Sequence, residues 1–206
     1  GNLIEGSGQY GNSSLRKTDY KTGDVLEKVD LNKQYFGEGV TVLKDKIYQL
    51  TWNENTAFVY DAKTLKQEKA MSYFREDLAG WGLTNDGTNL YMSDGSEKIY
   101  ILNPETFEMI DYINVYTNAN KIDFINEMEW IDGKIWANIY EKDMVIKINP
   151  KTGAIENILN LSELKGKVTK PLKQGEVLNG IAYNPKTKTI LVTGKNWDKA
   201  FEIKVE

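Results

Sequence analysis

The tetrapeptide Asp61-Ala62-Lys63-Thr64 decides the fold of this chain, because closely similar tetrapeptides recur along the sequence. The four copies, with intervals of 42, 42 and 46 residues between their threonines, are Asp19-Tyr20-Lys21-Thr22, Asp61-Ala62-Lys63-Thr64, Asn103-Pro104-Glu105-Thr106 and Asn149-Pro150-Lys151-Thr152. Each copy separates two short β-like segments. An Asp or Asn that leads a polar turn between two such segments is typical of a β-hairpin.

A second pair of β-like segments lies outside these hairpins and also recurs. Its first segments begin at Gly39, Gly82, Met128 and Gly180, and its tight turns are expected at Lys44-Asp45, Asp86-Gly87, Asp132-Gly133 and Asn184-Pro185. Four short strands per unit, repeated every 40 residues or slightly more, are typical of β-propeller blades. Helical structure is expected only as a single turn at residues 162–167.

The strand count predicts an all-β, five-bladed propeller formed as a single domain over residues 1–206. The second to fourth blades are complete. The first blade lacks its innermost strand, so that residues 3–8 form its second strand, and the last blade lacks its outermost strand. These two strands would be consecutive in an N-terminal extension of about 20 residues, so we expect the printed chain to be N-terminally incomplete.

The composition excludes several classes of site. The chain has 206 residues, a net charge of −4 and no run of like charges, which argues against a nucleic-acid groove. No apolar stretch is long enough for a transmembrane helix. With no Cys and no His, the chain has no thiolate nucleophile and no histidine base, so catalysis would use Asp, Glu, Lys, Asn, Tyr or Ser.

Candidate site residues are expected where the inner strand of each blade starts and its neighbour ends, because antiparallel neighbours bring these two points to the same end of the ring. The positions are Phe36, Glu38, Trp52, Trp81, Asp94, Asn126, Glu127, Tyr140, Asn179, Lys195 and Trp197. Packing between blades explains the aromatic residues equally well. The asparagines also fit strand-entry turns, Glu38 a solvated strand edge and Lys195 an ordinary surface lysine.

Several segments closely resemble the plant- and bacterial-type glutaminyl cyclases, also called glutaminyl-peptide cyclotransferases, over essentially the whole chain. They are Gly11-Asn12-Ser13-Ser14-Leu15-Arg16-Lys17, Tyr35-Phe36-Gly37-Glu38-Gly39, Gln49-Leu50-Thr51-Trp52, Gly80-Trp81-Gly82-Leu83-Thr84, Asn126-Glu127-Met128-Glu129, Leu178-Asn179-Gly180-Ile181-Ala182-Tyr183 and Thr193-Gly194-Lys195-Asn196-Trp197. That family has a five-bladed propeller fold, in agreement with the strand count. The family's Phe-Thr-Gln-Gly motif of the innermost first-blade strand does not occur in the printed sequence.

The resemblance implies an acyltransferase that converts the N-terminal glutamine of a peptide or protein to pyroglutamate and releases ammonia. By position it implies catalytic roles for Glu38, Asn126 and Lys195, and substrate-binding roles for residues Phe36, Trp52, Trp81 and Tyr140. Tyr140 stands where the family often has Trp, a change that alters pocket shape more than chemistry. The resemblance also implies a periplasmic, envelope-associated or secreted location. We expect a monomer that requires no cofactor, and the sequence leaves a structural calcium ion open.

Two other readings of the same residues remain open. One is a propeller that binds a peptide without chemistry. The other is a calcium-dependent hydrolase or lactonase, for which Asp94, Glu127 and Glu129 would be the candidate ligands, since carboxylates and amides hold calcium without histidine. Ammonia release from a Gln-initiated peptide, with and without chelator, distinguishes all three.

Overall fold

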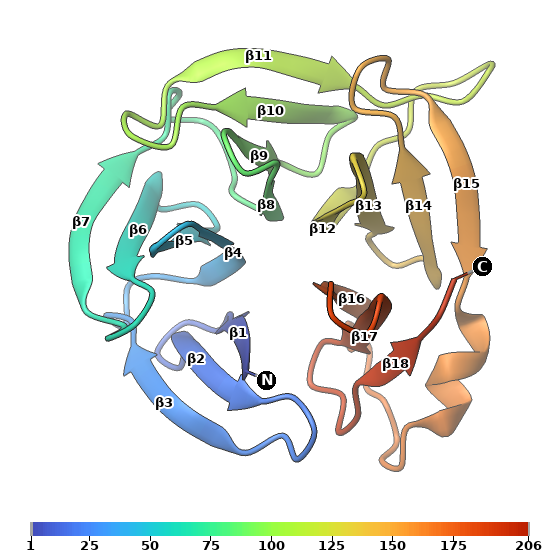
Figure 1. The fold of residues 1–206 in the computed structure, drawn as a ribbon, viewed down its shortest axis with the longest axis horizontal. Helices are drawn as coiled ribbons and strands as arrows, with labels where there is room; N and C mark the ends of the chain where they lie inside the picture. Colours follow the sequence, from blue (N-terminus) through green and yellow to red (C-terminus); the bar gives the residue numbers. More distant parts are fainter. Residues whose placement is uncertain (1, 206) are drawn as a thin grey trace. The chain divides into compact units, whose positions relative to one another are not determined.

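The computed structural model describes residues 2–205 and is a five-bladed β-propeller made of five small sheets (Figure 1). The first and last sheets have three strands each, namely β1 (Asn2–Ser7), β2 (Ser14–Asp19), β3 (Val25–Asp30) and β16 (Leu178–Asn184), β17 (Thr189–Gly194), β18 (Phe201–Ile203). The other sheets have four strands each, namely β4 (Gly37–Leu43), β5 (Lys46–Thr51), β6 (Thr56–Asp61), β7 (Gln67–Ser72); β8 (Leu83–Asn85), β9 (Leu90–Ser93), β10 (Lys98–Leu102), β11 (Met109–Asn114); and β12 (Ile125–Ile131), β13 (Lys134–Ile139), β14 (Met144–Ile148), β15 (Ile155–Asn160).

The strand count and order agree with the sequence-based prediction. β1 pairs with β2 in the first sheet, which confirms residues 3–8 as the strand next to residues 15–19. The predicted helical turn is the 3-10 helix η1 (Ser162–Lys167). Two of the four expected tight turns are longer than two residues: β8 and β9 are joined by residues 86–89, and β16 and β17 by residues 185–188, with Lys188 at φ 56°.

The recurrent tetrapeptides form the outer hairpin turns as expected. In each turn the leading Asp or Asn side chain accepts backbone N–H groups; for example, Asp61 Oδ1 accepts from Lys63 and Thr64. The residue that follows each tetrapeptide adopts the left-handed conformation, which explains why it is glycine in two of the four copies. The other two copies place Leu65 and Phe107 there, and both side chains are buried.

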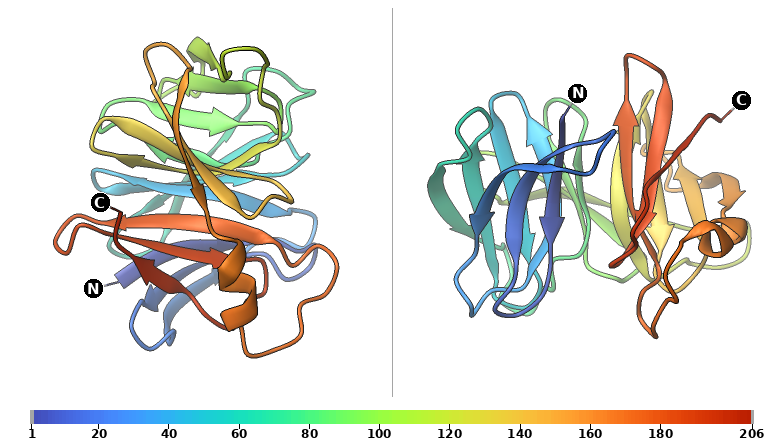
Figure 2. Two further views of the ribbon diagram at one scale, coloured as in Figure 1. Left: turned by 90° about the vertical axis from the view of Figure 1, so that its right-hand side faces the viewer. Right: turned by 90° about the horizontal axis from the view of Figure 1, so that it is seen from below.

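Contacts between residues divide the chain into two compact units, Gly1–Asp94 with Tyr100–Tyr112 (unit 1) and Gly95–Ile99 with Ile113–Glu206 (unit 2). Within unit 1, apolar side chains fill the space between successive sheets. One cluster joins the first two sheets through Leu15, Ile47 and Tyr60, and another includes Leu50 and Phe107. Figure 2 shows the first two sheets, coloured blue to teal, running side by side.

Within unit 2, the fourth and fifth sheets share an apolar cluster that includes Trp136, Leu178 and Val192. Leu164 is buried in the same cluster, so η1 closes the outer part of the junction between these sheets. Among residues 2–205, no helix is long and apolar enough to cross a membrane.

Candidate functional site

Three blades begin their inner strand with the same irregularity. The register of β4 against β5 shifts between Gly37 and Val40, that of β12 against β13 between Ile125 and Met128, and that of β16 against β17 between Leu178 and Ile181. A bulge of this kind bends the strand and redirects its side chains. The inner strands therefore start two or three residues earlier than the sequence predicted, and the bulges carry Glu38, Asn126 and Asn179.

A second repeated feature fixes the partner residue of each bulge. The residue that follows the second strand donates its N–H to a carbonyl two residues before the bulge residue. The three bonds are Trp52 N to Phe36 O at 2.9 Å, Tyr140 N to Phe124 O at 2.8 Å, and Lys195 N to Val177 O at 2.9 Å. The blades thus present three side-chain pairs in the same local geometry: Glu38 with Trp52, Asn126 with Tyr140, and Asn179 with Lys195.

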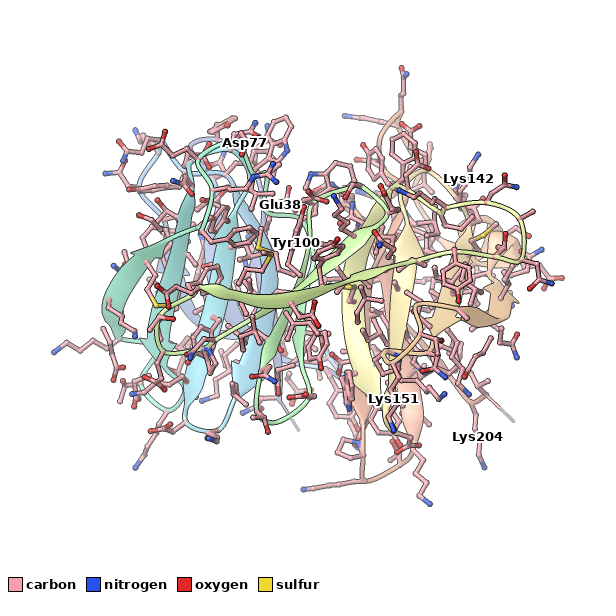
Figure 3. All side chains as sticks on the ribbon, turned by 90° about the horizontal axis from the view of Figure 1, so that it is seen from above. Glu38, Asp77, Tyr100, Lys142, Lys151 and Lys204 are labelled. Atoms are coloured by element: carbon pink, nitrogen blue, oxygen red, sulfur yellow. The ribbon has the colours of Figure 1, made fainter. Side chains whose placement is uncertain are left out.

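In unit 1, four predicted site residues form what we call the Glu38 group: Phe36, Glu38, Trp52 and Trp81. The Phe36 and Trp52 rings meet edge to face with their centroids 5.6 Å apart. Gly39 donates its N–H to Trp81 O at 2.8 Å, and a Cβ at Gly39 would come within 2.5 Å of Leu83 N, so only glycine allows this close approach of the two backbones. Figure 3 shows Glu38 toward the same end of unit 1 as Asp77.

Side chains that the sequence analysis did not single out hold the Glu38 group. Glu54 accepts the Phe36 N–H at 3.2 Å and the Tyr10 hydroxyl at 2.7 Å. The Tyr10 ring packs edge to face on Phe36, and its hydrogen bond to Glu54 raises the pKa of its hydroxyl. With 46% of Tyr10 and 37% of Trp52 exposed, the three rings form an aromatic row that solvent can reach.

Tyr73 holds the backbone next to the Glu38 group through hydrogen bonds of its hydroxyl. Its hydroxyl donates to Thr51 O and accepts from Thr51 N at 2.9 Å, so it fixes the residue that precedes Trp52. Gly80 then donates its N–H to Trp52 O at 2.8 Å, which ties the next blade to the same point. Tyr73 is buried, and this burial raises the pKa of its hydroxyl, so it acts as a neutral brace.

In unit 2, three predicted residues form what we call the Lys195 group: Asn126, Tyr140 and Lys195. The Lys195 ammonium lies 5.3 Å from the centre of the Tyr140 ring, a cation–π contact between the fifth and fourth blades. Asn126 is buried, whereas Tyr140 and Lys195 are each partly exposed. Lys142, two residues after Tyr140, lies at the opposite end of the fourth blade from Lys151 (Figure 3).

Glu129 is a buried carboxyl group of β12 that faces the next blade. Its Oε1 accepts the Tyr183 N–H at 2.9 Å. Desolvation by burial raises the pKa of Glu129 to about 7, and the hydrogen bond from Tyr183 opposes that shift. The residue keeps some solvent-accessible surface, but its carboxyl group is packed among protein atoms. Glu129 therefore changes charge close to neutral pH.

Two of the carboxylates considered for calcium, Asp94 and Glu129, have other hydrogen-bond partners. Within residues 2–205 there is no group of three or more Asp and Glu side chains arranged to hold a metal ion. Asp94 instead accepts the Tyr100 hydroxyl at 3.0 Å, and Glu129 accepts a backbone N–H. This arrangement does not favour the calcium-dependent reading.

The structure thus gathers the predicted site residues into two groups, four residues in unit 1 and three in unit 2. Sequence reasoning missed four further residues, namely Tyr10, Glu54, Tyr73 and Phe124. Phe124 occupies the position equivalent to Phe36, has a φ of 60° and is 51% exposed. The repeat could have revealed Phe124, since it stands two residues before Asn126, but Tyr10, Glu54 and Tyr73 act through contacts between segments remote in sequence.

Comparisons with known proteins agree with one another. The family model described as glutamine cyclotransferase matches residues 1–205. A glutaminyl-peptide cyclotransferase of Arabidopsis thaliana is 39% identical over 207 residues, and the match covers 99% of this chain but 63% of that relative's length. The crystal structure of Myxococcus xanthus glutaminyl cyclase is similar with a TM-score of 0.90 at 29% identity, covering 99% of this chain and 86% of that one. The WD40 propeller domain of Doa1, at 12% identity and a TM-score of 0.56 over 98% of this chain and 60% of its own, shares the fold alone.

Proposed function

The chain belongs to the glutamine cyclotransferase family, and we propose that it converts the N-terminal glutamine of a peptide or protein to pyroglutamate with release of ammonia. The observation that carries this proposal is the bulge at Glu38, whose flanking residues Phe36 and Gly39 are bonded through their backbones to Trp52 and Trp81. The Arabidopsis relative, a glutaminyl-peptide cyclotransferase, supports the same substrate class.

The reaction suits a chain without Cys or His. The α-amine of the substrate attacks its own γ-carboxamide carbon, so a C–N bond forms within one residue and no enzyme nucleophile is needed. The C–N bond of the carboxamide then breaks, and ammonia leaves. The enzyme must hold glutamine in the attacking conformation, take a proton from the amine, stabilise the oxyanion and protonate the leaving nitrogen.

We assign the proton transfers to Glu38, because it is the carboxylate of the Glu38 group. It takes the proton from the attacking amine and delivers it to the departing ammonia. Asn126 and Lys195 are the proposed donors to the oxyanion, since an amide N–H and an ammonium both stabilise developing negative charge. The resemblance to glutaminyl cyclases gives Phe36, Trp52, Trp81 and Tyr140 the role of binding the substrate, which suits their apolar rings.

No cofactor is required by this chemistry, because the nucleophile and the electrophile belong to the same residue of the substrate. The test is ammonia release from a peptide that begins with Gln, with and without a chelator. We expect release that the chelator does not change, together with a peptide product lighter by one ammonia in mass spectrometry. Chelator-sensitive hydrolysis of an ester or lactone would instead support the hydrolase, and binding without turnover would support the binding protein.

A further inference from the structure

The three bulged blades are equivalent in their backbone, but the function proposed above uses only five of the six side chains they present. Glu38 and Trp52, Asn126 and Tyr140, and Lys195 all have a role. The remaining residue is Asn179, the bulge residue of β16 and the equivalent of Glu38 and Asn126. Its neighbour across the strand end is Lys195, whose backbone N–H is bonded to Val177.

The Asn179 carboxamide has an unmet hydrogen-bonding requirement. Its Nδ2 is shielded from solvent and finds no acceptor among residues 2–205. Asn179 as a whole residue is partly exposed, although its Nδ2 is shielded. A buried donor without an acceptor costs about 1–3 kcal/mol, so the group is expected to gain an acceptor when the site is occupied.

The backbone at this bulge is held by a second asparagine. Gly180 adopts a φ of 139°, and its N–H donates to Asn138 Oδ1 at 3.1 Å. Asn138 lies on β13, is fully buried, and its own Nδ2 also finds no acceptor within the described part of the chain. A side chain of the fourth blade therefore fixes the bulge of the fifth, and Asn138 and Asn179 each keep a buried amide donor without an acceptor.

We infer that Asn179 is a further substrate-contacting residue, whose side-chain N–H donates to a carbonyl oxygen of the N-terminal glutamine, and that Asn138 positions it through Gly180. The inference rests on the proposed function. The last torsion of an Asn side chain is broad, so a small rotation suffices to direct Nδ2 at a bound oxygen.

The local chemistry specifies an oxygen acceptor. Asn179 and Asn138 offer unmet donors, and Lys195, the residue that follows the paired strand β17, carries a positive charge. A carbonyl or carboxamide oxygen satisfies such donors, whereas a protonated amine would be repelled. The substrate has two suitable oxygens, that of the γ-carboxamide and that of the main-chain carbonyl of the first residue. The experiment must tell them apart.

The test compares Asn179→Ala and Asn179→Asp with the control Asn184→Asp. Asn184 lies at the other end of β16, where its Oδ1 accepts the Lys186 N–H at 3.1 Å, a bond that aspartate keeps. The substrates are a Gln-initiated peptide and the same peptide with the main-chain carbonyl of Gln reduced to a methylene. For the normal peptide we expect kcat/KM to fall about 10-fold with alanine and about 100-fold with aspartate, and to stay unchanged in the control.

Each outcome decides the inference. If the penalty of Asn179→Ala disappears with the reduced peptide, the main-chain carbonyl is the partner; if it persists on both peptides, the γ-carboxamide is. Values within twofold of the control on both peptides, in a protein that turns over the substrate, would overturn the inference alone. If the protein binds the peptide without turnover and the variants lose binding, the proposed function fails and the inference stands.

A measurement on the unaltered protein tests the inference even if the variants do not fold. Side-chain amide resonances of Asn179 and Asn138 in ¹⁵N-resolved NMR spectra are expected to shift downfield when the peptide binds. The resonance of Asn184 is expected to stay in place. Binding that leaves the Asn179 resonance unmoved contradicts the inference.

Discussion

The two residue groups of the candidate site differ in how completely their polar atoms are paired. In unit 1, side chains hold the backbone around the Glu38 group: Ser13 Oγ accepts the Gly37 N–H, Glu54 accepts the Phe36 N–H, and the Tyr73 hydroxyl bonds both backbone groups of Thr51. In unit 2, the segment beside the Lys195 group leaves two buried amide donors, those of Asn138 and Asn179, without acceptors. It also buries a carboxyl group, Glu129, that titrates near neutrality.

The difference indicates that the two groups have different roles, one in proton transfer and the other in recognition of the substrate. A region whose polar atoms are hydrogen-bonded to one another holds one geometry. This suits a group such as Glu38 that must transfer protons over a fixed distance. A region with unmet donors gains most when a ligand arrives, which suits recognition of the substrate's oxygens. We therefore expect substitution of Glu38 in unit 1 to change kcat, and substitutions in unit 2 to depend on ligand and pH.

The largest effect is expected for Glu38→Gln. Glutamine keeps the shape of the side chain and most of its hydrogen bonds but cannot carry the proton, so kcat for a Gln-initiated peptide should fall on the order of 100-fold or more. Peptide binding should persist, as measured by equilibrium titration of the variant. A loss of only a few fold would mean that another carboxylate is the acid and base, and Glu127 would be the next to test.

The matched comparison for that variant is Trp81→Ala. The backbone bonds of Trp81 to Gly39 and Ser93 survive this change, so the bulge should keep its form. We expect KM to rise about 10-fold and kcat to change much less, because a wall is removed while the proton carrier stays. Steady-state kinetics on one peptide would show the contrast, and equal losses of kcat in both variants would contradict it.

The second-largest effect is expected for Glu129→Gln and concerns the free energy of unfolding. Its pKa is raised from 4.5 to about 7 in the folded protein, so the stability that the protonated form contributes is complete below pH 4.5 and is lost as the pH rises through 7. Glu129→Gln remains neutral and can still accept the Tyr183 N–H. The variant should match the parent at pH 5 and exceed it at pH 8, by up to about 3 kcal/mol in the free energy of unfolding.

Urea titrations at pH 5, 6, 7 and 8 measure this difference directly. Because other titrating groups are shared by the parent and Glu129→Gln, they cancel when the two curves are subtracted. A constant difference across the four pH values would show that the Glu129 carboxyl is not desolvated in the folded protein.

A smaller effect is expected for Tyr73→Phe. Removing the hydroxyl leaves the buried N–H and C=O of Thr51 without their side-chain partner, which should lower the free energy of unfolding by about 1–3 kcal/mol. Tyr91→Phe is the control, since that hydroxyl bonds the Asp86 side chain at the β8–β9 turn. If both variants lose the same stability, Tyr73 has no special role beneath Trp52.

The smallest effect is expected for Tyr10→Phe. The ring contact with Phe36 remains, and only the hydrogen bond to Glu54 is lost at a site open to solvent. We expect KM to rise by about threefold or less, with kcat unchanged. A larger loss, or any loss in kcat, would show that Glu54 needs Tyr10 to hold the Phe36 backbone.

Much of the fold followed from the local pattern. The turn beginning at Asp61 recurs because an Asp or Asn side chain pairs with its own backbone, an interaction complete within four residues. The strands on either side, their order within each blade and the 3-10 helix at Ser162–Lys167 were all expected from the sequence. The two strand ends that carry Trp52 and Tyr140 were also expected, since antiparallel pairing alone sets them.

Tertiary structure decided the rest. The bulges at Glu38, Asn126 and Asn179 depend on where the paired strand ends, and the sequence placed these strand starts two or three residues too late. The raised pKa of Glu129 and the unmet donors of Asn138 and Asn179 arise from residues more than 40 positions away packing against them. Local patterns report which backbone conformation a residue favours, whereas desolvation and hydrogen-bond pairing depend on neighbours that only the folded chain brings into contact.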